Sequence, residues 1–184
     1  MIITKLQYKY ITINKLMLKL SNLKNKGSHI HDEYQYLTLI KQILEHGNIE
    51  QGRNGITKSV FGTGMHFSLE NNQIPLLTTK RVAWKTCAKE LFWFISGSTD
   101  NSVLQKNNVK IWDANASADF LKERGLNYEE NDLGPVYGHQ WRHFNAGYKD
   151  CRTDYSGKGI DQLANVIKTL KDKSQQTSRR IIMS

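Results

Sequence analysis

Residues 83–97 read AWKTCAKELFWFISG, and this pattern predicts an amphipathic helix with a carboxylate on its apolar stripe. The stripe repeats at helical spacing, and its members are Ala83, Cys87, Glu90 and Phe94. Burying an ionised carboxylate is costly unless it is hydrogen-bonded, and desolvation raises its pKa toward the range useful for proton transfer. Glu90 is therefore a candidate proton-transfer group. The alternative is a residue at the helix border that reaches water or a structural partner.

Two further helices are predicted on either side of this one. Residues 31–47 place Asp32 at the start of a helix and Gly47 directly after it. Residues 160–173 repeat apolar side chains at helical spacing. Both segments are therefore expected to pack one face against the rest of the domain.

Strands are predicted in two places. Residues 59–70 alternate apolar and polar side chains like a half-buried strand, with an Asn71-Asn72 turn behind it. Residues 179–184 are predicted to be a second strand. Because helices and strands are mixed without a regular βαβ alternation, the expected fold class is α+β.

The composition favours a globular protein of the cytoplasm. With 184 residues the chain is long enough for one domain with a core. No apolar run approaches the roughly 18 residues needed to span a bilayer, and the N-terminus lacks a signal-peptide pattern. Cys87 and Cys151 are far apart and form no CxxC pair, so neither a disulfide framework nor a zinc site is expected.

The positive charge is concentrated in the first 28 residues. This leader holds six lysines and no acidic residue, while the whole chain carries a net charge of +9. We expect residues 1–28 to be a basic, poorly ordered extension and residues 29–184 to form the domain. An alternative is that the leader binds RNA or an anionic membrane surface.

Three arginines are candidates for binding phosphate. Arg53 lies in GRNGITKS, which differs from the phosphate-binding GxxxxGK[ST] loop because Thr57 replaces its second glycine and no strand is predicted before it. Arg179 and Arg180 are adjacent at a predicted strand start, so they point to opposite faces and would not easily share one phosphate of their own subunit. The alternative for all three is a solvated surface charge.

Aromatic side chains and glycines are dense in residues 111–115 and 132–144. These segments read IWDAN and DLGPVYGHQWRHF, a composition that suits a flat heterocycle. His139 and His143 have the spacing of a helical metal pair, but the preceding Gly134-Pro135 argues against a helix and no carboxylate ligand is obvious. No metal site is predicted.

Taken together, these segments resemble the thymidylate synthase family from about Glu33 to Ser184. The matching sequence motifs are FG, PLLTTKR, KELFWFISGST, IWDAN, DLGPVYGHQWRHF, DYSGKGIDQL and SRRIIM, and they occur in the same order as in the family. The resemblance implies methylation of dUMP to dTMP with 5,10-methylenetetrahydrofolate as co-substrate, yielding dihydrofolate. It also implies a homodimer with an α+β fold, in which helices pack on a mixed sheet.

The resemblance assigns a role to each candidate residue. Arg53 would hold the substrate phosphate, and Arg179 and Arg180 would reach across the dimer to the phosphate bound in the other subunit. Glu90 would organise water and proton transfer, and Tyr137 would order water near the pyrimidine. The folate site would be lined by Lys80, Ile111, Trp112 and Asn115.

The family's nucleophilic cysteine has no match in this sequence. In the family it follows the strand that begins with the paired arginines, and neither Cys87 nor Cys151 has its context. We therefore expect the N-terminal part of a thymidylate synthase domain, incomplete at its C-terminus and inactive alone, with a reductase domain allowed upstream. Alternatives are a non-catalytic fragment that docks on or regulates a full-length subunit, an RNA-binding protein, or a pyrimidine hydroxymethyltransferase.

Overall fold

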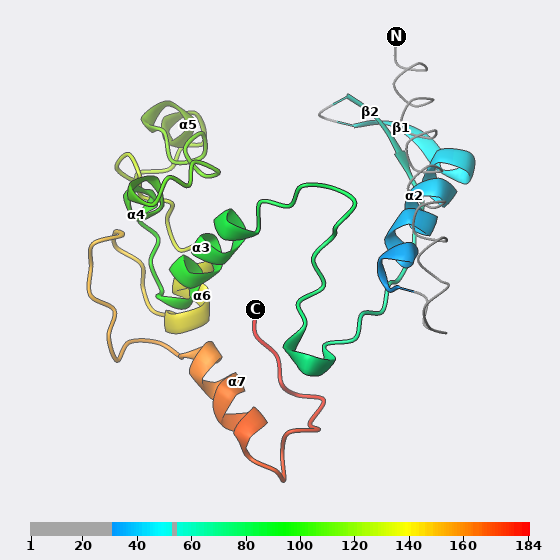
Figure 1. Ribbon diagram of the computed structural model, residues 1–184. Coiled ribbons are helices and arrows are strands. Elements are labelled where there is room, and N and C mark those ends of the chain that lie inside the picture. Colours follow the sequence, from blue (N-terminus) through cyan, green and yellow to red (C-terminus); the bar gives the residue numbers. More distant parts are fainter. Residues whose placement is uncertain (1–30, 53–54) are drawn as a thin grey trace. The chain divides into compact units, whose positions relative to one another are not determined.

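The computed structural model describes residues 31–52 and 55–184 (Figure 1). The chain divides into two compact units, one ending at Val82 and the other running from Ala83 to Ser184. Each unit is described by itself. The predictions for residues 1–28 and for Arg53 lie outside the described residues.

The first unit is built on helix α2 (Glu33–His46), which confirms the helix predicted there. Asp32 occupies the N-cap position, but its side chain makes no cap hydrogen bond and accepts from the Ser68 N–H at 3.1 Å instead. Gly47 follows the helix because a Cβ at that position would lie 2.6 Å from the Ile43 carbonyl oxygen. The chain then enters an antiparallel hairpin of β1 (Asn48–Gly52) and β2 (Gly55–Ser59).

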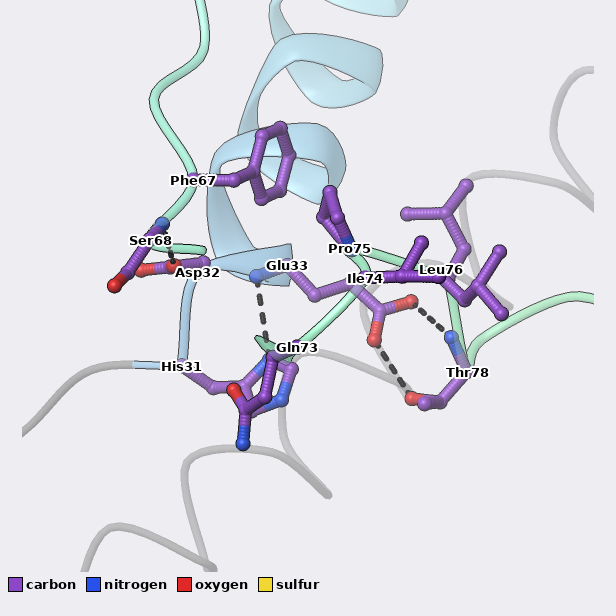
Figure 2. Close-up of a pocket in the computed structure, with 11 residues that line it drawn as sticks. His31, Asp32, Glu33, Phe67, Ser68, Gln73, Ile74, Pro75, Leu76 and Thr78 are labelled. Atoms are coloured by element: carbon purple, nitrogen blue, oxygen red, sulfur yellow. Dashed lines mark hydrogen bonds between the residues drawn. The ribbon is translucent and has the colours of Figure 1, made fainter. Parts of the chain in front are cut away.

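A buried carboxylate fastens residues 78–79 to the start of α2. The Glu33 side chain is 2% exposed, and its two oxygens accept hydrogen bonds from the backbone N–H and the hydroxyl of both Thr78 and Thr79, at 2.5–2.9 Å. Figure 2 shows the Thr78 bonds. Burial alone would raise the pKa of Glu33, but these hydrogen bonds outweigh it and hold the pKa below its ordinary value.

The strand predicted over residues 59–70 is wrong beyond Ser59. From Phe61 to Leu69 the backbone is irregular, and it is followed by a short 3-10 turn, η2 (Glu70–Asn72). The predicted turn is confirmed, since Asn71 and Asn72 both have φ of 58°. The physical reason for the error is that side chains of α2 bond this backbone in place of a neighbouring strand: Gln35 both donates to the His66 carbonyl and accepts from its N–H.

The hairpin contradicts the prediction that no strand precedes residues 52–59. A strand, β1, does precede the GRNGITKS segment, although none was predicted. Thr57 in β2 still occupies the place of the second glycine, so the segment departs from the phosphate-binding loop as expected.

The second unit is helical among its described residues (Figure 1). The predicted central helix is confirmed as α3 (Trp84–Ile95), and the predicted third helix as α7 (Gln162–Lys171). Between them lie three short helices, α4 (Asn101–Lys106), α5 (Ala118–Glu123) and α6 (Tyr137–His143). Its apolar core consists of Trp93, Leu104 and Val109.

Helix α6 contradicts the expectation that Gly134-Pro135 would prevent a helix near His139. The two residues precede the helix, and Val136 in an extended conformation is its N-cap, so the proline removes no helical hydrogen bond. Gly138 brings α6 close to the end of α3, because a Cβ there would lie 2.5 Å from the Ser98 carbonyl oxygen.

One arginine of α6 connects three helices of this unit. The Arg142 guanidinium donates to the Ile95 carbonyl at the end of α3, at 2.7 Å, and forms an ion pair with Asp161 at 3.0 Å. Asp161 in turn caps the start of α7 by accepting from the Ala164 N–H at 2.9 Å. Neither residue was predicted from the sequence to have a role.

The strand predicted over residues 179–184 is also wrong. Arg179 and Arg180 lie in an exposed turn, and residues 181–184 form no strand. An alternation of apolar and polar residues predicts which side chains share a face of a strand, but it does not predict a partner strand. Here the backbone of Ser184 forms hydrogen bonds with the side chain of Gln162 instead. Among the described residues the sheet has two strands. Helices with a small sheet agree with α+β; a larger mixed sheet is not seen in this part of the chain.

Over residues 31–52 and 55–184, no helix has the length and apolar character that crossing a membrane requires.

Removing the Glu33 carboxylate should loosen residues 78–79. Because Glu33→Ala leaves four donors without their buried acceptor, we expect a loss of about 3 kcal/mol of local stability. Amide hydrogen exchange at Thr78 and Thr79 should therefore accelerate roughly 100-fold. Glu50→Ala, at an exposed position of β1, is the matched control and should leave these rates unchanged. Equal rates in the two variants would contradict the assignment.

The same contact should depend on pH in one direction. Since the folded-state pKa of Glu33 is lowered, its stabilising contribution is complete above the unfolded carboxyl pKa of about 4.3 and is lost as the pH falls through the folded value. Protection of the Thr78 and Thr79 amides should fall in this acid range in the wild type. In Glu33→Gln that pH dependence should be absent.

Candidate active site

Glu90 faces a specific partner across the second unit. Helix α3 carries its half-buried side chain, and Oε1 accepts a hydrogen bond from the indole Nε1–H of Trp112 at 2.7 Å. This contact agrees in part with each of the two alternatives for Glu90. The side chain is half-buried, and its carboxylate has a hydrogen-bonding partner within the protein. The bond joins a predicted catalytic residue to a predicted folate-site residue 22 positions away.

Trp112 of this pair belongs to a group of neighbouring aromatic side chains. Phe94 lies one turn after Glu90 on α3, and its ring centroid is 5.1 Å from that of Tyr137 and 5.5 Å from that of Trp141. The Trp112 and Tyr137 centroids are 6.4 Å apart. We call Phe94, Trp112, Tyr137 and Trp141 the aromatic group. Phe94 and Trp112 also pack against the apolar core, which anchors the group to the fold.

The aromatic group leaves polar and flat surface open to a ligand. Tyr137, the first residue of α6, is 54% exposed. Ile111 and Asn115 are also exposed and flank Trp112 in the same turn. A carboxylate with one engaged oxygen, joined through Trp112 to an exposed tyrosine ring, can orient a planar heterocycle and exchange protons with it.

The structure thus brings together three of the predicted site residues, Glu90, Trp112 and Tyr137, with Ile111 and Asn115 beside them. Lys80 belongs to the first unit, where its ammonium group lies 5.6 Å from the centre of the Tyr36 ring. Arg179 and Arg180 have exposed side chains in the turn after α7. Phe94 and Trp141 were not predicted as site residues, although Phe94 belonged to the same stripe as Glu90.

Neither cysteine is placed as an activated nucleophile. Cys87 is exposed on α3, one turn before Glu90. Cys151 lies in a loop where its N–H donates to Asp132 at 3.0 Å. Burial raises the pKa of the Cys151 thiol to about 11, and the negative charge of Asp132 adds to this effect, so the thiol is protonated at neutral pH.

His139 is a core residue of α6. It is 1% exposed, its Nε2 lies 3.2 Å from the Ala146 carbonyl oxygen, and its ring packs edge-on against Tyr148 and Tyr155. Burial lowers the pKa of His139, so the ring is neutral and Nε2 is the donor to the carbonyl. Within the described ranges, no group of three or more potential metal-ligating side chains is found.

A separate pocket of about 330 Å³ lies in the first unit, between the start of α2 and residues 73–78 (Figure 2). Its two carboxylates are both engaged, Asp32 by the Ser68 N–H and Glu33 by Thr78 and Thr79. The remaining wall is largely apolar, with Phe67, Ile74 and Leu76 in Figure 2. Of these two carboxylates, Glu33 has both oxygens bonded and Asp32 has one, and His31 also lines the pocket.

Comparison with known proteins decides the family. A family model for thymidylate synthase matches residues 34–184. The chain belongs to the thymidylate synthase family. Among curated relatives, it is 53% identical over 156 residues to the bifunctional dihydrofolate reductase-thymidylate synthase 2 of Arabidopsis thaliana, which covers 84% of this chain and 27% of that protein.

Two further relatives carry only the synthase name. The chain is 49% identical over 158 residues to the thymidylate synthase of Agaricus bisporus and 48% identical over 155 residues to thymidylate synthase 1/2 of Encephalitozoon cuniculi. Each match covers 84% of this chain, and 53% and 52% of those proteins respectively. The chain therefore spans about half, or less, of the length of these relatives.

The close approach of α6 to α3 gives a test of the site's frame. A Cβ in Gly138→Ala would lie 2.5 Å from the Ser98 carbonyl oxygen, so α6 must shift, at a cost of about 1–3 kcal/mol. Gly147→Ala meets nothing within 4 Å and should change stability by less than about 0.5 kcal/mol. Denaturant unfolding followed by tryptophan fluorescence measures both. A Gly138→Ala variant as stable as Gly147→Ala would contradict the packing described.

Proposed function

We propose that this chain is part of a thymidylate synthase, which methylates dUMP to dTMP with 5,10-methylenetetrahydrofolate as co-substrate and yields dihydrofolate. The observation that carries the proposal is the 2.7 Å hydrogen bond from Trp112 to Glu90, with the exposed Tyr137 ring beside it. Family membership supplies the reaction, and the arrangement of these three side chains supports the site. Cytoplasmic location stays a prediction.

The proposed roles follow from what each side chain offers. Glu90 has one oxygen bound to the indole, and no hydrogen bond from the described residues reaches its other oxygen, which can therefore hold water and move protons at the bound rings. Tyr137 presents a phenol that can order that water. Trp112 with Ile111 and Asn115 offers a flat, partly apolar surface to the folate, and Lys80 a positive charge to its glutamate tail.

The attacking group is proposed to come from outside these 184 residues. The reaction begins when a thiolate adds to C6 of the pyrimidine and makes C5 nucleophilic toward the one-carbon unit. Cys87 lies exposed on α3, and Cys151 is protonated and shielded in its loop. The chain alone is therefore expected to bind ligands without turning them over.

The substrate phosphate is proposed to be bound by Arg53 of one subunit and by Arg179 and Arg180 of the other. Both residues of the pair are exposed, which leaves their guanidinium groups available to a neighbouring chain. Guanidinium groups bind phosphate through paired, charge-assisted hydrogen bonds. This arrangement requires a homodimer or a pairing with a full-length subunit.

A mixed dimer tests the trans arrangement directly. A full-length relative such as the Agaricus bisporus enzyme, with its arginines matching Arg179 and Arg180 replaced by alanine, should bind dUMP weakly. When this chain is added in excess, it supplies the missing pair in trans, and the KM for dUMP should fall tenfold or more, the scale of one charged hydrogen bond. Dihydrofolate formation measures the rate.

The control is this chain with Arg179 and Arg180 both replaced by alanine, which should dimerise without lowering the KM. If the wild-type chain forms the mixed dimer and the KM does not fall, the trans assignment is wrong. If activity instead decreases in proportion to the chain added, the alternative of a regulatory fragment is favoured.

A further inference from the structure

The turn that carries Trp112 has few attachments of its own. Residues 111–115 belong to neither a helix nor a strand, and their backbone hydrogen bonds are local, such as those from Asn115 and Ala116 to the Trp112 carbonyl. A tryptophan on such a turn would take several orientations unless side chains from elsewhere hold it. Packing of Trp112 against the apolar core supplies one such contact, and the turn itself has a second, polar support.

That support comes from α4. Oδ1 of Asp113, the residue after Trp112, accepts a hydrogen bond from Asn101 Nδ2 at 2.9 Å and another from Gln105 Nε2 at 3.0 Å. Asn101 and Gln105 are four residues apart and so lie on one face of the helix. Among the described residues, the hydrogen bonds that reach residues 111–115 from outside residues 110–117 are these two and the bond with Glu90.

Asn101 is the rigid member of this support. It is 0% exposed, and its backbone N–H donates to the Asn131 carbonyl at 2.9 Å, whereas Gln105 is an exposed side chain. Asn101 Oδ1 is buried and accepts nothing from the described residues. If Nδ2 and Oδ1 exchanged positions, the amide oxygen would face the Asp113 carboxylate, and two acceptors cannot form a hydrogen bond. Asp113 therefore determines the orientation of the Asn101 amide. Nδ2 also donates to Asn131 Oδ1 at 3.4 Å, so the bond to Asp113 is the shorter of the two hydrogen bonds that this buried amide makes.

We propose that Asn101 is a positioning residue of the candidate active site. Its buried amide holds Asp113, and the turn thereby presents Trp112 to Glu90. The relevance to catalysis rests on the proposed function, in which Glu90 moves protons. The support itself depends on the hydrogen bonds from Asn101 and Gln105 to Asp113.

The test uses the indole N–H of Trp112 as a reporter in the whole chain. Its ¹H–¹⁵N signal is assigned as the one missing in Trp112→Phe. Asn101→Leu keeps an apolar side chain of similar size in the buried site but removes the donor. We expect the Trp112 signal to shift or broaden and its exchange with water to accelerate at least tenfold.

Two internal references separate positioning from general loosening. The Trp93 indole donates to the Asp100 carbonyl at 3.0 Å, so an unchanged Trp93 signal shows that the start of α4 is still in place. Asn107→Ala is the matched control variant: this exposed asparagine at the end of α4 donates to the Val103 carbonyl and not to Asp113. It should leave the Trp112 signal unchanged.

The proposal is overturned if Asn101→Leu is folded and its Trp112 signal and exchange rate equal those of Asn107→Ala. If Asn101→Leu no longer unfolds cooperatively, Asp113→Ala decides, because it removes the acceptor of the Asn101 amide from a half-buried position of the turn. An acceleration of the same sign supports the proposal, and no acceleration overturns it.

A binding measurement separates this inference from the proposed function. Dihydrofolate titrated into the chain by calorimetry, with dUMP present, should bind Asn101→Leu about tenfold more weakly than the wild type and Asn107→Ala equally. Equal binding of Asn101→Leu and wild type would remove the catalytic relevance of Asn101. If the wild type binds no dihydrofolate, the proposed function fails, while the indole reporter still decides the role of Asn101.

Discussion

The hydrogen bond between the Trp112 indole and the Glu90 carboxylate is the contact on which the rest of the site depends. It joins α3, the longest described helix of the second unit, to a turn that belongs to neither a helix nor a strand. Without it, neither the Glu90 carboxylate nor the Trp112 indole would have a hydrogen-bonding partner among the described residues. With it, the Glu90 carboxylate is bound to Trp112, whose ring centroid lies 6.4 Å from that of the exposed Tyr137.

Polar side chains, and not apolar area alone, hold the segments of each unit together. Glu33 fastens residues 78–79 to α2, Asn101 and Gln105 hold the turn at Asp113, and Arg142 with Asp161 connects α3, α6 and α7. Each group is satisfied or nearly so, which is the condition for a buried polar contact to stabilise a fold. Such contacts also fix orientation, and orientation is what a site for two planar ligands requires.

The sequence predicted the long helices and the family, but not the contacts. Helices α2, α3 and α7 were confirmed because a repeat of 3.6 residues is a local property. The strands predicted over residues 59–70 and 179–184 failed because alternation says nothing about a partner, and in the first case Gln35 took the backbone groups of His66. Helix α6 was missed because Pro135 was read as a helix breaker although it precedes the first turn. Glu90 was singled out by the apolar stripe of its helix, and the roles of Glu90, Trp112 and Tyr137 came from family resemblance. The bond between Glu90 and Trp112 spans 22 positions and leaves no pattern in the sequence.

The most direct test of this account is whether a folate ring binds against Trp112. Dihydrofolate added to the chain with dUMP present should quench a saturable part of the tryptophan fluorescence, and that part should be missing in Trp112→Phe and unchanged in Trp84→Phe, which alters an exposed tryptophan of the same helix as Glu90. Equal, non-saturable quenching in all three proteins would show that the group of Glu90, Trp112 and Tyr137 is not where the co-substrate binds.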